Sequence, residues 1–429
     1  MIGAGVYLWG TRIGTVAQED VGHAAVFSYE KNFLQSGIEV SPLWMPLSVR
    51  NYSFPGLNRE TFRGLPGMLA DSLPDRYGTK LLEMAFARRG RDARDISAVE
   101  RLCYTGKRGM GALEYRPATE LVSTRSESLD LDVLVRAASE VLTERESFET
   151  AESDFKRLIS VGTSAGGARA KAVIAWNRTT GAIRSGQTKA QPGFEHFIVK
   201  FDGVSGNRDH GDTDDGAEFT RIEYAYYKMA LRAGIDMNEC VLIRQNGRYH
   251  FATKRFDRIG ENGEKLHMQT LGALAHFDYN DPGTNSYEQA AQVVLRLGMG
   301  QREVEQLYRR MVFNVIARNQ DDHVKNISFL MDRSGRWNLS PAYDVTFAVD
   351  PANRWLRQHQ MSVNGKLSGI TTEDLFEAGA NMNISRARCR RIVNDVAGAV
   401  AAWQEYALEA EISEETMEAI KGEFVSVEK

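Results

Sequence analysis

A polar cluster followed at a fixed distance by a further aspartate constrains this chain more than any other feature. Residues 319–326 read Asn-Gln-Asp-Asp-His-Val-Lys-Asn, with Asp321 five positions before Asn326 and Asp344 eighteen positions after it. Phosphoryl transfer needs little covalent help from a protein, but it needs oxygen-ligated metal ions and a carboxylate aimed at the attacking hydroxyl. Two aspartates and an asparagine at this spacing supply that set, as in the catalytic loops of kinases. The pattern therefore indicates a phosphotransfer centre.

The segments around the cluster favour this interpretation over a solvated turn, which is the commonest origin of a lone Asp-x4-Asn match. An apolar, helix-like run at 311–317 precedes it, and a strand-like run at 327–331 follows it. A turn at 332–335 then leads into the sequence Ser340-Pro-Ala-Tyr-Asp344. A loop, a hairpin and a second acidic loop would bring Asp344 back beside Asn326.

Three other segments carry residues suited to a nucleotide. Residues 161–171 hold three glycines within six positions, which frees backbone N–H groups to approach a phosphate, although an ordinary loop before the strand at 172–176 explains them equally well. Lys200 follows a strand-like run, and residues 254–257 follow another. Alone, Lys200 would be a surface lysine. Residues 254–257 could equally be the exposed end of a core strand.

A metal hydrolase is the rival enzyme class. Its candidate ligands are Asp321, Asp322, His323 and Asp344. The other histidines show no HxH or HExxH spacing, so this alternative is weaker. We expect His323 to hydrogen-bond the loop backbone and Lys325 to neutralise phosphate charge, whereas Asp322 is assigned no role.

Together these segments resemble the HipA-type serine/threonine kinases, the toxins of bacterial HipBA toxin-antitoxin pairs. The resemblance rests on Asp-Asp-His-Val-Lys-Asn at 321–326 with Ser-Pro-Ala-Tyr-Asp at 340–344, and on further matches at 65–75, 164–171, 196–200 and 253–258. It covers most of the chain. It implies an α+β, protein-kinase-like two-lobed fold: a mixed α/β small lobe, a mostly α large lobe and a β-rich amino-terminal module.

The resemblance also implies roles for individual residues. Asp321 is expected to be the catalytic base, and Asn326 and Asp344 the Mg²⁺ ligands. Ser164 is the expected autophosphorylation site, and we hypothesise that its modification expels the glycine-rich loop and stops the kinase. The expected ATP-binding residues are Ser164, Gly166, Gly167, Lys200, Lys254, Arg255, Phe256 and Asp257.

Composition agrees with a cytoplasmic enzyme. The chain has 429 residues, a formal net charge of −4, and hydrophobic and charged fractions ordinary for a globular protein. Three widely separated cysteines without metal spacing fit free thiols in a reducing compartment. No apolar run is long enough to span a membrane, and the first residues lack the pattern of a signal peptide.

The predicted domains are 1–120, an amino-terminal module; 121–257, the small lobe; and 258–429, the helical large lobe. Strands are predicted near 5–9, 12–16 and 24–29, and a surface loop at 202–216. A helical region interrupted by Pro66 and Pro74 is predicted at 67–89. Further helices are predicted at 129–142, 218–233, 287–297, 302–317, 373–378, 386–408 and 414–423. The basic cluster at 386–391 is typical of a solvated face, although in the family such a surface can lie against DNA.

The leading hypothesis is thus an ATP- and Mg²⁺-dependent protein kinase. The resemblance implies as its substrate a translation factor, such as glutamyl-tRNA synthetase or another aminoacyl-tRNA synthetase. It also implies neutralisation by a HipB-like helix-turn-helix antitoxin, which would bring the complex to operator DNA. The alternative is a non-catalytic partner and co-repressor of that antitoxin, which retains the fold without phosphotransfer. The substrate's identity, toxicity and oligomeric state are not encoded in any motif.

Overall fold

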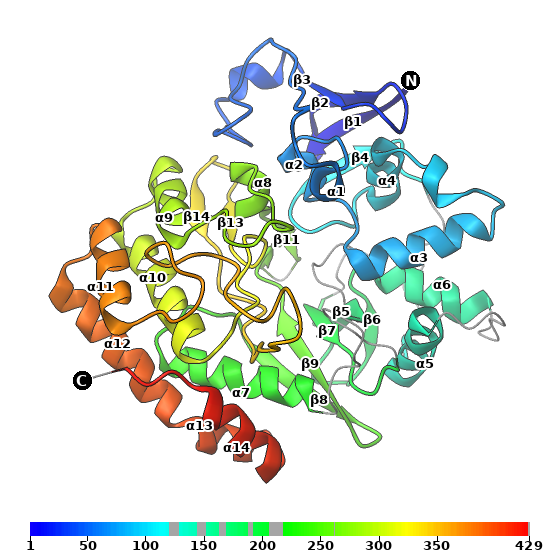
Figure 1. The fold of residues 1–429 in the computed structure, drawn as a ribbon. Coiled ribbons are helices and arrows are strands. Elements are labelled where there is room, and N and C mark those ends of the chain that lie inside the picture. Colours follow the sequence, from blue (N-terminus) through cyan, green and yellow to red (C-terminus); the bar gives the residue numbers. More distant parts are fainter. Residues whose placement is uncertain are drawn as a thin grey trace. The chain divides into compact units, whose positions relative to one another are not determined.

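The computed structural model describes residues 1–119, 128–143, 152–162, 169–187, 192–205, 218–260 and 262–427. The chain forms two compact units. Unit 1 comprises residues 1–215, 252–269 and 330–336, and unit 2 comprises residues 216–251, 270–329 and 337–429. Figure 1 shows the elements of both units coloured along the chain.

The amino-terminal part of unit 1 is built on a four-stranded antiparallel sheet with the order β3-β2-β1-β4. The strands are β1 (Ile2–Leu8), β2 (Thr11–Gln18), β3 (Val26–Tyr29) and β4 (Leu113–Arg116). Buried residues alternate with more exposed ones along β1, as expected for a sheet with one face against a core. Helix α4 (Ala98–Thr105) packs on this sheet, and its amino terminus carries a capping box formed by Ser97 and Glu100.

Short helices fill the connection between β3 and α4. They are η1 (Phe33–Ser36), α1 (Arg59–Phe62), α2 (Gly67–Ala70), α3 (Arg76–Ala87) and η2 (Ala93–Asp95). The helical region predicted at 67–89, with Pro66 and Pro74 as interruptions, is therefore divided into α2 and α3. Pro74 lies between α2 and α3, and Asp75 caps the second helix by accepting a hydrogen bond from the Gly78 backbone N–H at 2.6 Å.

Further along the chain, unit 1 contains helices α5 (Leu131–Leu142) and α6 (Glu152–Val161). A five-stranded sheet has the order β6-β5-β7-β9-β8. Its strands are β5 (Lys171–Trp176), β6 (Ile183–Ser185), β7 (Glu195–Lys200), β8 (Cys240–Gln245) and β9 (Arg248–Lys254). Strands β5, β6 and β7 belong to unit 1, whereas β8 falls in unit 2. Strands β5 and β7 are antiparallel, with Lys171 directly opposite Lys200.

Smaller strands complete the sheet structure. Strands β10 (Arg258–Ile259) and β11 (Glu264–Lys265) form a two-stranded sheet. A three-stranded sheet has the order β12-β13-β14, with β12 (His267–Thr270), β13 (Ser328–Met331) and β14 (Trp337–Leu339). The turn predicted at 332–335 is confirmed, since Asp332 Oδ1 accepts a hydrogen bond from the Ser334 N–H at 2.9 Å.

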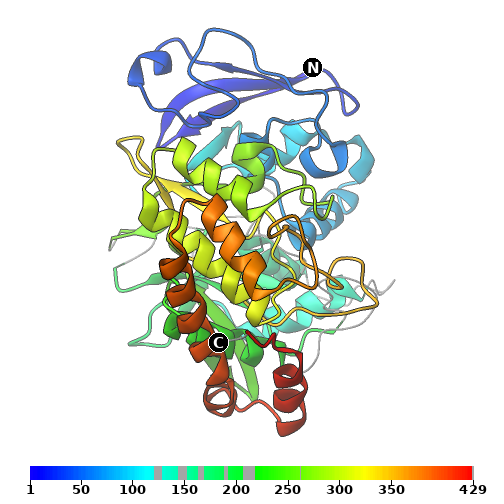
Figure 2. The same cartoon turned by 60° about the vertical axis from the view of Figure 1, so that its left-hand side comes forward.

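Unit 2 is mostly helical. Its helices are α7 (Phe219–Arg232), α8 (Leu271–Ala275), α9 (Tyr287–Arg296), α10 (Gln301–Ile316), α11 (Thr372–Asn381), α12 (Arg386–Ala401), α13 (Trp403–Glu409) and α14 (Glu414–Glu423). Helix α10 packs against α9 and α12, and α7 packs against α12 and α13. Figure 2 brings the carboxy-terminal helices, coloured orange to red, to the front of this unit.

An aromatic cluster forms part of the core of unit 2. The ring of Tyr226, on α7, makes edge contacts with Phe313 and Trp403, with centroids 6.1 and 5.5 Å apart. The Tyr226 hydroxyl donates to the Ala317 carbonyl at 2.6 Å, at the end of α10. The core therefore fixes the point at which the chain leaves α10 for the polar cluster.

The α+β fold class and the β-rich amino-terminal module are confirmed. The helix predicted at 386–408 is instead two helices, α12 and α13, which meet at Ala402. The predicted boundary near residue 120 and most of the predicted 202–216 loop lie outside the described residues. The three predicted domains stay a prediction.

Candidate active site

The end of helix α10 begins the candidate site. The Ala317 N–H donates to the Phe313 carbonyl at 2.8 Å, which closes the helix. Arg318 then takes a left-handed backbone conformation with φ 59°, so the chain leaves the helix axis. Asn319 is fastened back to the last turn of α10 twice, because its N–H donates to the Asn314 carbonyl at 2.9 Å and its Nδ2 to Asn314 Oδ1 at 3.0 Å.

The loop after Asn319 is stabilised by its own polar groups. The Asn326 N–H donates to the His323 carbonyl at 2.8 Å, and Asn326 Nδ2 donates to the Asp321 carbonyl at 2.8 Å. The Lys325 N–H donates to His323 Nδ1 at 3.2 Å, as expected from the sequence for a histidine that supports the loop. Because the amide nitrogen of Asn326 is used within the loop, its oxygen is the atom left to face a ligand.

The segment that carries Asp344 is held against this loop. The Tyr343 hydroxyl donates to the Lys325 carbonyl at 2.5 Å and also contacts the Ser328 hydroxyl. Arg310 Nη2, from α10, donates to the Ser340 carbonyl at 2.6 Å. These contacts hold the residues just before Asp344, which adopts a left-handed conformation with φ 51°. The expected return of Asp344 to Asn326 is therefore observed.

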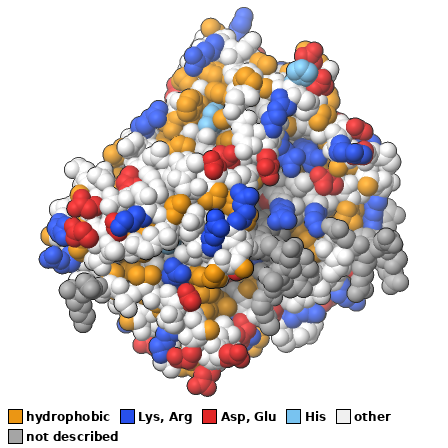
Figure 3. Space-filling model, in the orientation of Figure 1, with side chains coloured by type: hydrophobic (Ala, Val, Ile, Leu, Met, Phe, Trp, Pro, Cys, Tyr) orange, Lys and Arg blue, Asp and Glu red, His pale blue; other side chains and the backbone are white. Residues whose placement is uncertain are grey.

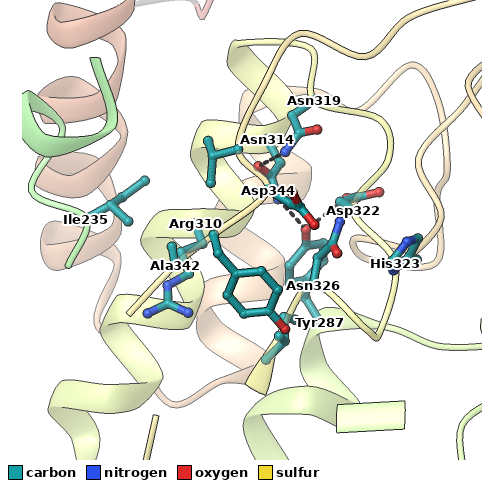
Figure 4. A pocket seen from close by; sticks show the side chains of 13 residues that line it. Ile235, Tyr287, Arg310, Asn314, Asn319, Asp322, His323, Asn326, Ala342 and Asp344 are labelled. Carbon is teal, nitrogen blue, oxygen red and sulfur yellow. Dashed lines mark hydrogen bonds between the residues drawn. The ribbon is translucent and has the colours of Figure 1, made fainter. Parts of the chain in front are cut away.

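Asn326 and Asp344 line one pocket within unit 2, which encloses about 400 Å³ of space, part of it open to solvent. Figure 4 shows the Asp344 side chain near its centre, beside those of Asn326 and Asp322. Other lining residues are Ile235, Tyr287, Arg310, Asn314, Asn319, His323 and Tyr343. The pocket thus joins the two predicted metal ligands.

The donor atoms in this pocket fit Mg²⁺. Asp344 supplies a carboxylate and Asn326 a carbonyl oxygen, and Mg²⁺ in nucleotide sites is typically held by one or two carboxylates with the remaining positions left to phosphates and water. Asn319 Oδ1 is buried and has no hydrogen-bond partner among the described residues. In the described part of the chain no three His, Cys, Asp or Glu side chains gather as a zinc hydrolase would require, so the rival enzyme class gains no support.

Asp321, His323 and Lys325 lie along the same loop. The side chains of Asp321 and His323 are 17% and 18% exposed, with Asp321 Oδ1 3.8 Å from His323 Nε2. The Lys325 ammonium lies 4.4 Å from the centre of the Tyr279 ring, and that ring is 6.0 Å from the His323 imidazole. A cation over an aromatic face is held without being neutralised, so Lys325 keeps its charge for an anionic ligand.

Arg310 gives the floor of the pocket a positive charge. Its side chain is buried, and burial lowers the pKa of the guanidinium to about 10, so it remains protonated at neutral pH. Its Nε and Nη1 have no hydrogen-bond partner among the described residues. Sequence reasoning missed Arg310, since nothing in the pattern of an apolar helix marks one arginine as buried. It included Tyr343 in the segment at 340–344 but gave it no role.

The predicted nucleotide-binding residues that the structure describes lie in unit 1. Lys200 ends strand β7 and is 9% exposed. Lys254, on β9, forms an ion pair with Glu195. Ser164, Gly166 and Gly167 lie outside the described residues. The ATP-binding role of all these residues stays a prediction.

Arg255 and Asp257 form a buried network with Arg258. Asp257 accepts hydrogen bonds from Arg255 Nη2 at 2.8 Å, Arg258 Nη1 at 2.7 Å and the Gly111 N–H at 2.7 Å. Burial would raise the pKa of Asp257, but the charges of the two arginines outweigh it and hold the pKa well below its ordinary value. The contacts give Asp257 a structural role toward the amino-terminal module. Phe256, between the two, is half-buried.

The basic cluster at 386–391 is partly neutralised within unit 2. Arg386 pairs with Glu373 on α11, and Arg388 pairs with Glu305 on α10, both with N–O distances below 3 Å. Where α11 and α12 lie in Figure 1, Figure 3 shows Lys and Arg side chains next to Asp and Glu side chains. A solvated face with paired charges, as the sequence suggested first, describes this surface.

Comparison with known proteins identifies the family. The HipA N-terminal domain matches residues 4–116, and the HipA-like C-terminal domain matches residues 163–403. The chain belongs to the HipA family. The fold of this HipA-family protein is similar to that of one chain in the structure of the HipA, HipB and operator DNA complex of Shewanella oneidensis MR-1. The TM-score is 0.70, and the match covers 98% of this chain and 94% of that chain with 16% sequence identity.

Two curated relatives match parts of the chain. The "Putative kinase Y4mE" of Sinorhizobium fredii is 25% identical over 197 residues, which is 42% of this chain and 46% of the relative. A "Putative kinase" of Haemophilus influenzae is 28% identical over 142 residues, 30% of this chain and 41% of the relative. The matched part therefore spans less than half of either relative. Within the described residues, no helix is both long and apolar enough to cross a membrane.

Proposed function

We propose that this HipA-family protein is an ATP- and Mg²⁺-dependent protein serine/threonine kinase of the toxin type. The observation that carries the proposal is the pocket of unit 2, in which Asn326 and Asp344 meet beside the loop that holds Asp321. The names of the two curated relatives and the toxin-antitoxin complex that shares the fold support it.

Each residue has a distinct task in this proposal. Asp321 accepts the proton of the substrate hydroxyl as that oxygen attacks the γ-phosphorus, which is then released from ADP. Asn326 and Asp344 hold Mg²⁺, which supplies positive charge to the phosphate oxygens when bound. Lys325 adds positive charge from the same loop, and Lys200 contacts the phosphates of ATP.

The remaining nucleotide contacts are assigned by the resemblance alone. The glycines at 166 and 167 would cover the phosphates, and Lys254, Arg255, Phe256 and Asp257 would lie near the adenine. Ser164 is the proposed autophosphorylation site, and its phosphate would exclude ATP from the glycine-rich segment. Phosphopeptide mapping after incubation with ATP tests this assignment. If the Ser164→Ala protein still accumulates the phosphate seen in wild type, the assignment is wrong.

The proposed partners follow the family. A HipB-like helix-turn-helix antitoxin would bind the kinase and bring it to operator DNA, and the substrate would be an aminoacyl-tRNA synthetase such as glutamyl-tRNA synthetase. The proposed compartment is the cytoplasm. Incubation of the purified kinase with labelled ATP and bacterial lysate, followed by identification of the labelled band, tests the substrate assignment.

The deciding experiment compares wild type with Asp321→Gln, which removes the base while leaving a polar side chain of similar reach. Labelled phosphate from ATP should enter protein only with wild type. Equal incorporation by both proteins would favour the alternative, a non-catalytic co-repressor of the antitoxin that keeps the fold. The Asp321→Gln protein must show the same thermal unfolding midpoint as wild type, so that loss of labelling reports a loss of chemistry and not a loss of folding.

A further inference from the structure

Asp322, which the proposed chemistry does not use, is a fully buried carboxylate beside Asp321. Its side chain is 0% exposed. It accepts hydrogen bonds from the Tyr287 hydroxyl at 2.8 Å, from His359 Nδ1 at 2.9 Å and from the Gln360 N–H at 2.7 Å. A carboxylate only accepts hydrogen bonds, so Nδ1 of His359 carries the hydrogen. A buried carboxylate with three donors is strongly held in place.

The first donor connects Asp322 to two helices. Tyr287 is the first residue of α9, and its hydroxyl accepts a hydrogen bond from Asn314 Nδ2, on α10, at 2.9 Å. Asn314 Oδ1 in turn accepts from Asn319 Nδ2. Burial, and then the charge of Asp322, raise the pKa of Tyr287 far above its ordinary value, so the hydroxyl stays protonated and remains a donor.

The other two donors belong to the segment that follows Asp344. Residues 345–370, all of them described, contain isolated bridges and turns but no helix or strand. Backbone hydrogen bonds hold parts of this segment, from the Gln320 N–H to the Ala348 carbonyl and from the Tyr287 N–H to the Ser362 carbonyl. Asp322 is the side chain through which residues 359 and 360 reach the loop at 319–326.

In protein kinases the segment after the metal-binding aspartate is commonly ordered by phosphorylation, which creates new pairs between arginine and phosphate. Here residues 359 and 360 of that segment are already held by hydrogen bonds to the buried Asp322. We propose that Asp322 is a positioning residue that orders residues 359–363 and braces the loop at 319–326, so that phosphotransfer needs no phosphorylation within 345–370. This inference rests on the proposed kinase function.

The matched pair of variants for its test is Asp322→Asn and Asp281→Asn. Asparagine keeps the shape of Asp322 but turns an amide nitrogen toward a donor, which breaks at least one of the three hydrogen bonds. Asp281 is exposed and lies in the turn at 281–284 of the same unit, so the same chemical change there leaves the network intact.

Hydrogen exchange monitored by mass spectrometry tests the bracing independently of any catalysis. Peptides that cover 359–363 and 319–326 should exchange faster in Asp322→Asn than in wild type or Asp281→Asn, while peptides from α12 should not change. Unchanged exchange in both segments would overturn the inference. A protein that exchanges faster throughout has lost its fold. In that case Tyr287→Phe, which removes a single donor, is used in place of Asp322→Asn. It should speed hydrogen exchange in the same two segments only.

Kinetics test the consequence for the reaction. Because a displacement of about 1 Å at a reacting group costs about 100-fold in rate, kcat for Asp322→Asn should fall by about that factor, with KM for ATP within about threefold of wild type. Adding Tyr287→Phe to Asp322→Asn should slow the reaction by less than the product of the two single effects, because both changes act on one hydrogen-bond network. A fall in kcat/KM through KM alone contradicts the positioning role. If wild type transfers no phosphate, the proposed kinase function is wrong, but the hydrogen-exchange result still tests whether Asp322 braces the two segments.

The third measurement concerns phosphate itself. Only Thr346, Ser362 and Ser368 carry hydroxyl groups in residues 345–370. Wild type treated with phosphatase, and shown by peptide mapping to lack phosphate in this segment before and after the assay, should keep its full initial rate. A rate that appears only once one of these three residues is phosphorylated would overturn the inference.

Discussion

At the scale of single residues, the backbone of Asp344 is the most informative feature. A non-glycine residue with φ of 51° is uncommon, although aspartate and asparagine tolerate it better than most residues. Such conformations persist where the surroundings impose them, and they concentrate at functional sites. Here the Tyr343 hydroxyl and the Arg310–Ser340 hydrogen bond hold the residues just before Asp344, whose side chain lines the pocket.

Replacing Asp344 by Asn should therefore separate charge from shape. Asparagine accepts the left-handed conformation, so the free energy of unfolding should stay within about 0.5 kcal/mol of wild type. Loss of the negative charge at the metal should lower kcat about 100-fold. Asp395→Asn, at an ion pair with Arg309 in which Asp395 is 47% exposed, is the matched control and should leave the rate unchanged. Equal rates for the two variants would remove Asp344 from the mechanism.

The sequence predicted some of the residues in this site and missed others, for a physical reason. Asp321, Asn326 and Asp344 could be predicted because their spacing is set by one loop and one hairpin. The burial of Asp322 could not, because aspartate is usually exposed and its partners Tyr287 and His359 lie 35 and 37 positions away. Only the packed structure brings those residues together.

At the scale of elements, prediction succeeded where the hydrophobic pattern was strong and failed at breaks. The helical run before the polar cluster and the strand after it are α10 and β13. The helix predicted at 386–408 proved to be two, whereas the helical region at 67–89 is interrupted at Pro74, as its sequence indicated. Periodicity reports which face is buried, and it continues across a short break in the helix axis, so it cannot locate Ala402 as a boundary.

His196, on strand β7, should make the stability of the protein depend on pH. His196 is buried on β7, and burial together with the charges of Arg255 and Arg258 lowers its pKa to about 4. The unfolded chain binds a proton near pH 6.5, whereas the folded one does not until about pH 4. The contribution of neutral His196 to the free energy of unfolding is thus complete above pH 6.5 and is lost as the pH falls toward 4.

Urea unfolding at several pH values measures this contribution. Between pH 6.5 and 4.5 the free energy of unfolding of wild type should fall more steeply than that of His196→Gln, by up to about 1.4 kcal/mol per pH unit. Parallel curves for the two proteins would mean that His196 does not titrate differently in the folded and unfolded chains.

At the scale of the whole molecule, the chain consists of two units, and the amino-terminal module is an integral part of unit 1. Besides the Asp257 network, Trp9 Nε1 donates to the Lys265 carbonyl at 2.8 Å, and Gln269 Nε2 donates to the Val40 carbonyl at 2.6 Å. The sequence identified the module as a separate domain of unknown role. Contacts between residues more than 200 positions apart leave no local pattern to read.

Gly111 offers a test of this integration. It has φ of +71°, and a Cβ there would lie 2.7 Å from the Met268 backbone nitrogen, whereas a Cβ at Gly10, with φ of +85°, would meet nothing within 4 Å. Gly10→Ala should cost about 1 kcal/mol of unfolding free energy through backbone strain alone. Gly111→Ala should cost at least about 2 kcal/mol more, because backbone must move. If chemical denaturation shows that the two variants lose the same unfolding free energy, the backbone at Met268 moves aside at little cost.

The central claim, that the pocket of unit 2 holds the metal and phosphates of a nucleotide, is tested most directly by a crystal structure with Mn²⁺ and a non-hydrolysable ATP analogue. The account predicts an anomalous peak at about 2.0–2.2 Å from Asn326 Oδ1 and an Asp344 carboxylate oxygen, with the terminal phosphate beside Asp321. Nucleotide and metal bound together elsewhere, with Asn326 and Asp344 in contact with neither, would contradict it.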